Sequence, residues 1–477
     1  MEQERRLSMQ FNREHRGDAP NPGGVQPSAF RGAPWLELTD ALLERLRGRM
    51  SLIQPRGERR EMVAEALERV FQDTNGKFRA LAAPAEREAF IEAFLSYGII
   101  EDLLDDPAVE DIIINATNPI FVHRVDDGLV KTDRRFAHAA ELAVFVKKLI
   151  VFAGRFEVDS INDVELYELR GRVNIIHSPF GPQITIARGK TQPFTILQLI
   201  DTGMLTDGLA AQLWMYVEGL RVRPANVLIA GGPGTGKTTL LNALLSFIPW
   251  KDRLVIIEDT LELNTTFMEN CARLESCRRL KTPDLVKNSL RMRPERILVG
   301  EVRGVEARDL MTTVNLGKYC MGTLHASSAR ETILRLQNEP MNVPPVLVSL
   351  VDAFIILRKL NTEGKIRRVV SELVETSGME QQTVLLSTVW SYNHAEEKVV
   401  EGLPSSTYRD RLATESGRTA PQVMEETARR AEILRRMRES GRFPDIAAVT
   451  QFCQLYGDQP DEALRQLGIS PKPHSRR

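Results

Sequence analysis

The residues best suited to chemistry begin with a glycine-rich segment in the middle of the chain. Residues 231–238 read Gly-Gly-Pro-Gly-Thr-Gly-Lys-Thr and fit the phosphate-binding pattern G-x-x-x-x-G-K-[ST] without a mismatch. A short apolar run at 226–230 precedes the segment, and residues 239–245 have the spacing of a helix. Because the motif requires this strand–loop–helix context, the segment predicts binding of a nucleoside triphosphate.

The residue types in this loop each have a physical reason. Glycines let backbone N–H groups curl around a phosphate, since a Cβ would crowd the approach, and the following helix points its partial positive end at the anion. We expect Lys237 to reach the β- and γ-phosphates and the Thr238 hydroxyl to hold Mg²⁺. The predicted nucleotide contacts in the loop are Gly232, Pro233, Gly234, Thr235, Gly236, Lys237, Thr238 and Thr239.

Carboxylates follow two further apolar runs. Glu258 and Asp259 come directly after the run at 254–257, and Glu301 comes shortly after the run at 297–299. The carboxyl ends of parallel strands are where such sheets bind ligands, so these acids are candidates for metal binding and for water activation. The alternative for Glu258 and Asp259 is a pair of surface charges. We predict that Glu301 polarises the attacking water, which requires hydrogen-bond reach to it.

One histidine and many arginines are further candidates. His325 follows a third apolar run; a lone histidine is more often structural, but its place at a strand end favours a role beside the nucleotide. Most arginines lie on solvated faces, and a few could stabilise charge on a transferring phosphoryl group. Spacing alone does not choose among Arg273, Arg278, Arg279, Arg291, Arg293, Arg296, Arg303 and Arg308.

Composition excludes several classes of protein. The 477 residues include 63 Lys and Arg against 64 Asp and Glu, a balance that argues against a general electrostatic grip on nucleic acid. The four cysteines form no C-x-x-C pair, which disfavours a zinc site or a disulfide framework. No apolar run of about 18 residues and no secretory signal are present, so we expect no transmembrane segment. Any membrane attachment must then come through a partner.

The order of elements predicts two domains and two flanking regions. Residues 1–35 are polar and rich in Arg, Gly and Pro, which is typical of a disordered tail. Helical and strand patterns are mixed over 36–205, which predicts an α+β domain with leading helices. The expected helices lie around 36–50, 57–72, 86–97 and 139–154, and the expected strands at 111–115, 120–125, 172–176 and 183–187.

Apolar runs and helical segments alternate over 206–404. This pattern predicts a parallel sheet with helices on both faces. The expected strands are 227–230, 254–257, 297–299 and 321–324, and the runs at 353–357 and 367–373 flank a turn and predict a hairpin at the sheet edge. Residues 405–477 have a helical pattern, with a helix expected at 421–440. Gly441 follows this helix and is a stop signal for it.

Four motifs in order carry a family resemblance. Residues 231–238, 256–263, 290–303 and 322–326 resemble the Walker A motif, Asp box, Walker B motif and His box of the secretion ATPases of type II and type IV systems. The resemblance runs from roughly residue 95 to 470. Three further segments are similar to archaeal members, among which the archaellum motor and type IV pilus assembly ATPases are the nearest: 213–218, 337–345 and 429–437.

The resemblance implies an α/β fold, with a RecA-like P-loop NTPase core, a preceding α+β N-terminal domain and a small helical C-terminal region. It also implies a homo-hexameric ring in which Mg²⁺ and ATP bind between the two domains, and a polytopic membrane platform protein as partner. Such a protein is cytoplasmic and peripheral at the inner face of the cytoplasmic membrane, and no nucleic acid is expected.

By motif position, the resemblance assigns roles to individual residues. Catalytic roles fall to Glu301, Glu258, His325 and Lys237, with Glu301 as the Walker B acid and His325 as the γ-phosphate sensor. Metal binding falls to Thr238, Asp259 and Glu301, and nucleotide contacts from the N-terminal domain to Arg172 and Arg188. Lys318 stands where relatives usually carry Gly-His, and residues 159–169 depart from the usual loop.

The leading hypothesis is therefore an ATP-hydrolysing motor for pilus or archaellum assembly. Two alternatives remain open: a related ATPase for secretion or DNA transfer, and a scaffold that binds nucleotide without hydrolysing it.

Overall fold

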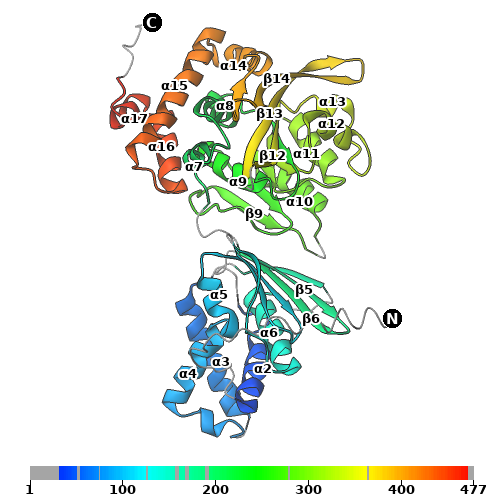
Figure 1. Ribbon diagram of the computed structural model, residues 1–477, viewed down its shortest axis with the longest axis vertical. Helices are drawn as coiled ribbons and strands as arrows, with labels where there is room; N and C mark the ends of the chain where they lie inside the picture. The colour runs from blue at the N-terminus through cyan, green and yellow to red at the C-terminus, as the bar shows by residue number, and fades with distance from the viewer. Residues whose placement is uncertain are drawn as a thin grey trace, which may run out of the picture. The chain divides into compact units, whose positions relative to one another are not determined.

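The structure is a computed structural model, and it forms two compact units, Met1–Arg188 and Gly189–Arg477 (Figure 1). It describes residues 32–50, 54–74, 76–124, 127–155, 161–166, 171–188, 193–277, 280–362 and 365–470. The expected tail therefore lies outside the described residues except for 32–35, where the first helix begins. Each unit is considered below by itself.

The first unit packs helices against one antiparallel sheet. In its described part, six strands pair in the order β3-β2-β1-β6-β5-β4. Alternate side chains such as Ile112, Ile114, Val173 and Ile175 are buried against the helices, whereas the intervening residues remain more accessible. The elements are α2 (Ala33–Leu46), α3 (Arg56–Asp73), α4 (Pro84–Leu95), α5 (Glu101–Asp105), β1 (Val109–Asn115), β2 (Phe121–Arg124), β3 (Gly128–Lys131), α6 (Ala139–Phe152), β4 (Ile161–Leu166), β5 (Gly171–Ser178) and β6 (Gly181–Ala187).

The second unit is built on a larger, mostly parallel sheet. Among its described residues, nine strands run in the order β15-β14-β13-β12-β7-β11-β10-β8-β9. The strands from β12 to β9 in this order are mutually parallel. They are β7 (Val227–Gly231), β8 (Leu254–Glu258), β9 (Cys271–Glu275), β10 (Arg296–Val299), β11 (Tyr319–Leu324) and β12 (Ala353–Thr362), and the antiparallel ones are β13 (Lys365–Glu380), β14 (Thr383–Asn393) and β15 (Lys398–Glu401).

Helices cover both faces of this sheet, as predicted. In β7, Val227 and Ile229 join the buried cluster on one face, whereas Leu228 and Ala230 join the cluster on the other. The fold is therefore the predicted α/β, RecA-like P-loop core. The first face carries α7 (Ile196–Asp201), α8 (Asp207–Glu218), α9 (Lys237–Leu244), α14 (Thr407–Ser416), α15 (Ala420–Ser440), α16 (Ile446–Asp458) and α17 (Pro460–Gln466); the second carries α10 (Thr282–Ser289), α11 (Glu306–Asn315), α12 (Ala329–Gln337) and α13 (Pro345–Val348).

One prediction about the sheet is wrong. The hairpin expected at the sheet edge is β12–β13, and it lies inside the sheet, because β12 pairs with β7 in parallel and β13 pairs with β14. The strands β14, β15 and β9 were not predicted. In β14, Ser and Thr interrupt the apolar residues and buried positions do not strictly alternate, so the pattern of a half-buried strand is hidden.

The C-terminal helices pack onto the core through α15 and α8. The predicted helix at 421–440 is α15, which starts with a capping box between Thr419 and Gln422 and ends at Gly441 in the left-handed conformation (φ 62°). The predicted stop signal is confirmed. No helix in the described part of the chain combines the length and hydrophobicity needed to cross a bilayer.

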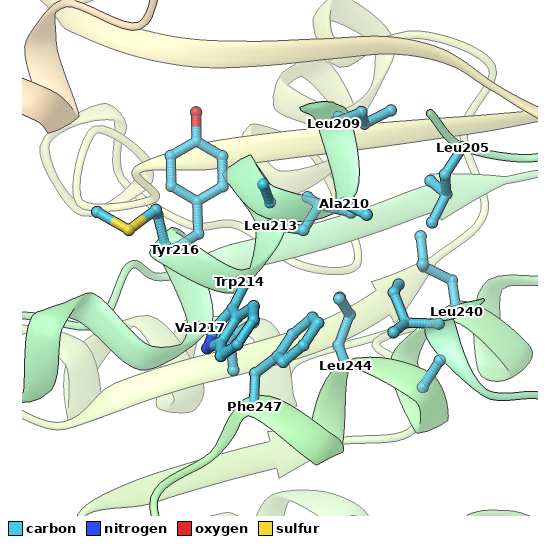
Figure 2. Packing of buried hydrophobic residues seen from close by; sticks show 14 of the residues in the cluster. Leu205, Leu209, Ala210, Leu213, Trp214, Tyr216, Val217, Leu240, Leu244 and Phe247 are labelled. Carbon is cyan, nitrogen blue, oxygen red and sulfur yellow. The ribbon is translucent and has the colours of Figure 1, made fainter. Parts of the chain in front are cut away.

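A buried aromatic cluster joins these helices. Figure 2 shows the rings of Trp214 on α8 and Phe247 lying face to face; their centroids are 5.0 Å apart. The guanidinium of Arg430 on α15 lies 4.7 Å from the centroid of the Trp214 ring and pairs with Glu218 and Glu426. Since Arg430 is buried, these two carboxylates and the ring replace the water that the charge loses.

We expect Trp214→Ala to destabilise the second unit by about 3–5 kcal/mol, because it opens a cavity and removes the ring beneath Arg430. Calorimetric unfolding of the full chain measures the loss. The control is Trp250→Ala: Trp250 is 58% exposed, and we expect a loss below about 1 kcal/mol. Equal losses in the two variants would contradict the role of the cluster.

Candidate nucleotide-binding site

The glycine-rich loop connects β7 to α9, which confirms the predicted strand–loop–helix context. Gly234 and Gly236 have positive φ angles of 68° and 95°, where a side chain would be strained. A Cβ at Gly231 would lie only 2.5 Å from Thr235 Oγ1 and 2.8 Å from the carbonyl oxygen of Leu357. The backbone path of the loop therefore depends on glycine at these three positions.

The loop and the start of α9 fit a polyphosphate. Helices α7, α8, α12 and α15 are each capped by a Ser or Thr side chain, whereas in the described residues no side chain caps α9. The first N–H groups of α9 are therefore available to bind an anion. The Lys237 ammonium lies inside the loop and donates hydrogen bonds to the carbonyls of Gly231 (3.0 Å) and Gly232 (3.1 Å). Burial lowers the pKa of Lys237, which the charge of Glu301 partly offsets.

Three predicted catalytic residues form a chain of polar contacts. His325 Nδ1 lies 3.5 Å from Lys237 Nζ, and His325 Nε2 lies 2.9 Å from Glu301 Oε1. Because an ammonium can only donate, Nδ1 accepts and Nε2–H donates to Glu301, which assigns the neutral imidazole. Burial and the neighbouring Lys237 charge lower the pKa of His325, which favours the same neutral form.

Glu301 is held in its ionised form. Burial by itself raises its pKa, but the hydrogen bond and charge of Arg303, together with His325 and Lys237, bring the pKa below its ordinary value. Glu301 Oε2 accepts the hydrogen bond from Arg303, and Oε1 faces His325. A carboxylate that stays charged at neutral pH can accept a proton or bind a cation.

The Asp-box residues differ from each other in environment. Asp259 Oδ1 accepts hydrogen bonds from Ser276 Oγ (2.8 Å) and Thr282 Oγ1 (2.9 Å). Glu258 is 3% exposed, and its Oε1 accepts the backbone N–H groups of Glu262 (2.9 Å) and Leu263 (3.0 Å).

Glu258 therefore fixes the backbone of the loop that follows β8. Its Oε2 lies 3.3 Å from Arg273 Nη2, yet burial dominates and raises the pKa of Glu258 to about 7. Asn242 on α9 holds the next residue of the same loop, since its amide exchanges two hydrogen bonds with the backbone of Asn264. Sequence reasoning missed Asn242, because no motif marks a contact between these segments.

Metal binding by Thr238, Asp259 and Glu301 stays a prediction. The described residues include no cluster of three or more His, Cys, Asp or Glu that could hold an ion by themselves. Mg²⁺ in nucleotide sites is commonly bound through one or two carboxylates together with phosphate oxygens. The chemistry of a hydroxyl and two carboxylates fits that requirement, and it needs the nucleotide to complete the ligand set.

The candidate arginines separate into groups. Arg172 pairs with Asp163 at 3.5 Å, and Arg188 donates to the carbonyls of Asp106 and Val109, so both contact their own, first unit. Their approach to the nucleotide stays a prediction. Arg278 and Arg279 lie outside the described residues.

Two other arginines show contrasting surroundings. Arg296 is 4% exposed, and its guanidinium contacts Asp252 (2.6 Å) and the carbonyl of Val217, so it fixes the start of β10. Arg303 is more open and joins two predicted site acids, since it contacts Glu301 and lies 3.9 Å from Asp259.

Arg368 is a loop contact that the sequence reasoning missed. Its Nε donates to the carbonyl of Gly234 at 2.9 Å. Leu357 pairs with Gly231, so the part of the β12–β13 hairpin that follows Leu357 reaches past the end of β7 and lies beside the phosphate loop. The strand containing Arg368 was predicted, but the pairing that carries it to the loop was not.

The fold and this site define a P-loop nucleotide-binding protein. The family described as type II/IV secretion system protein matches residues 94–443, which is well over half of the chain. The chain therefore belongs to the type II/IV secretion system protein family.

Several individual proteins are similar to this chain. An uncharacterized protein of Methanocaldococcus jannaschii is 30% identical over 392 residues, covering 78% of this chain and 70% of its own. The conjugal transfer protein TrbB of Rhizobium radiobacter is 29% identical, covering 58% of this chain and 86% of its own. Among solved structures, the ATPase DotB of Legionella pneumophila is 23% identical with a TM-score of 0.44, covering 60% of this chain and 80% of its own.

We expect Arg368→Ala to weaken binding of a fluorescent, slowly hydrolysed ATP analogue about three- to tenfold, since the variant loses one charge-assisted contact that shapes the loop. Fluorescence titration in Mg²⁺ measures the change. Arg367→Ala is the matched control, because the adjacent Arg367 pairs with Glu397 at 2.6 Å instead of with the loop. A loss of the same size in both variants would argue for a general charge effect instead.

Proposed function

We propose that this chain hydrolyses Mg²⁺-ATP and uses the energy for mechanical work. The observation that supports this most is the link Lys237–His325–Glu301, which joins the phosphate loop to an ionised carboxylate through a neutral imidazole. Phosphoryl transfer requires mainly positioning and charge stabilisation, and these three groups supply both.

In the proposed mechanism, each residue acts on a defined part of the reaction. The loop N–H groups and Lys237 bind the β- and γ-phosphates, and Glu301 orients and polarises the attacking water. Mg²⁺, when bound through Thr238 and the site acids, would neutralise charge on the phosphate oxygens. His325 contacts both Lys237 and Glu301, so displacement of Lys237 by a phosphate would alter the hydrogen bonding of the water-activating carboxylate.

At the level of the assembly, we propose a homo-hexameric motor for a type IV pilus-like or archaellum filament. Family membership supports this, together with the similarity to archaeal members in residues 213–218, 337–345 and 429–437. The proposed partner is a polytopic membrane platform protein, at the inner face of the cytoplasmic membrane. Arg172 and Arg188 would complete the nucleotide site from the first unit.

A second candidate is an ATPase for DNA transfer or secretion. Curated relatives named as conjugal transfer proteins favour it, for example TrbB of Rhizobium radiobacter. The two candidates differ in their response to nucleic acid: a DNA-transfer machine should bind DNA in a salt-dependent manner, and DNA should activate its turnover.

We expect Glu301→Gln to retain ATP binding and to lose turnover by about 10²-fold or more, because the amide cannot accept the proton of the water. Lys237→Ala should lose ATP binding itself. Phosphate release and analogue binding, measured on the same preparations, separate the two effects. Glu380→Gln changes an exposed glutamate of the same unit and serves as the control. Wild-type turnover in Glu301→Gln would remove the proposed role, and absence of turnover in the wild type would favour a scaffold.

The proposed hexameric ring also predicts how the ATPase activity depends on protein concentration. If subunits complete one another's sites, the Mg²⁺-ATPase activity per subunit should rise with protein concentration and then level off where the ring is fully assembled. Activity assays over a hundredfold range of concentration, paired with light scattering for molecular mass, test this. Activity that stays constant while the mass changes from monomer to hexamer would show that each subunit works alone.

A further inference from the structure

The β12–β13 hairpin contacts two separate segments of the nucleotide site. Arg368 donates to the carbonyl of Gly234 in the phosphate loop, as described above. Four residues further along the same strand, Glu372 Oε1 accepts the backbone N–H of Ala329 at 2.9 Å. Ala329 is the first residue of α12, and the short segment that leads from β11 to it begins at His325. One hairpin therefore contacts both the phosphate loop and the segment that carries the imidazole.

A bulge in β13 makes these two contacts compatible. Strict alternation along a strand would place Arg368 and Glu372 on the same face of the sheet. The pairing of β13 with β12 shifts at Ser371, which has no partner in the register. Before this bulge Val370 is buried in the cluster of the first face, and after it Val374 is buried in the cluster of the second. A bulge changes the direction of a side chain, so it turns Glu372 towards the face that carries α12.

The contact from Glu372 differs in kind from the contacts that α12 makes for itself. Ser328 caps the helix by accepting the N–H of Glu331 at 3.1 Å, which shapes the turn but does not attach it to the sheet. The hairpin supplies that attachment twice, since Arg358 Nη2 also donates to the carbonyl of Ser327 at 3.4 Å. A carboxylate in the first turn is favoured by the partial positive charge at a helix start. Glu372 is therefore the stronger of the two links.

The position of His325 depends on this attachment. Its side chain is 37% exposed, so packing alone fixes the ring only in part. Its Nδ1 lies 3.5 Å from Lys237 Nζ, at the limit of a hydrogen bond, while its Nε2 contacts Glu301. Because one of the two contacts is already long, a small shift of the backbone at 325–329 would break the link between Lys237 and Glu301.

We propose that Glu372 is a positioning residue for His325. It fixes the start of α12 to the sheet and thereby keeps the imidazole between Lys237 and Glu301. Together with Arg368, it makes the β12–β13 hairpin a rigid link between the phosphate loop and the segment that follows β11. The effect on turnover rests on the proposed hydrolysis of ATP, whereas the attachment of α12 does not.

Two variants at this position test the proposal. Glu372→Ala removes the acceptor, and Glu372→Gln keeps an oxygen that can accept the N–H of Ala329. On the full chain without nucleotide, hydrogen exchange measured by mass spectrometry should be about tenfold faster at the start of α12 in Glu372→Ala, as loss of a hydrogen bond to a charged acceptor allows. Glu372→Gln should restore exchange close to that of the wild type.

The same variants should separate turnover from binding. With Mg²⁺-ATP, Glu372→Ala should lower kcat about tenfold or more, because the imidazole is displaced, while the Kd of the slowly hydrolysed analogue changes by less than about twofold. Glu372→Gln should keep kcat within about threefold of the wild type. A merely structural role would not produce a loss confined to kcat that the conservative variant reverses.

Asp445→Ala is the matched control, because Asp445 also accepts a backbone N–H at a helix start, that of Ala448 on α16 at 2.8 Å. Both alanine variants should lower the melting temperature, but only Glu372→Ala should lower kcat. Equal losses of kcat in the two variants, or a loss of analogue affinity as large as the loss of kcat, would overturn the proposal.

Unchanged exchange at the start of α12 in Glu372→Ala would also overturn it. This readout does not require turnover, so it decides the attachment even in a chain that binds ATP without hydrolysing it. In that case the proposed function fails, while faster exchange that Glu372→Gln reverses would still support the role of Glu372.

Discussion

The parallel alignment of β7, β11 and β10 is the constraint on which the site depends. Because the three strands are neighbours and run in the same direction, Lys237, His325 and Glu301, which follow them, meet at one edge of the sheet. Each residue comes from a different part of the chain, so the contact exists only when the sheet is assembled in this order. The charge states along this chain of contacts are compatible. The lysine contacts a neutral imidazole, the imidazole contacts an ionised carboxylate, and no like charges are adjacent.

Behind this edge, backbone contacts hold the loops in place. Glu258 is buried at the end of β8 and accepts two backbone N–H groups of the loop that follows, while Asn242 on α9 binds the adjacent residue of that loop, Asn264. The helix that follows the phosphate loop is thereby joined to the Asp box. A shift of α9 would be transmitted to Asp259 through these hydrogen bonds, which gives the site a physical route by which binding of phosphate can influence the acidic loop.

The parts of the structure that a sequence can predict are those specified locally. The phosphate loop, the apolar runs of β7, β8, β10 and β11, and the stop of α15 at Gly441 each carry their own signal within a few residues, and the structure contains all of them. The interior place of β12 and the contact from Arg368 to Gly234 depend on pairing between distant strands. Nothing near Arg368 marks it as a loop contact, since its position follows from the register of β12 against β7. Likewise, β14 was missed because its burial is decided by neighbours and not by its own alternation.

Two kinds of interior therefore lie on the same face of the second unit. Around Trp214, large rings and the Arg430 guanidinium fill the space between α8, α15 and α16, and every charge there has a counterpart nearby. Other side chains of the same two helices, among them Gly208, Ala428 and Ala431, border a space of about 250 Å³ that is not filled. The filled region joins α15 and α16 to the core through ring contacts and a buried ion pair. Removal of a ring from the aromatic cluster should therefore cost more stability than a change of similar size beside the unfilled space, because closely packed groups lose more contacts.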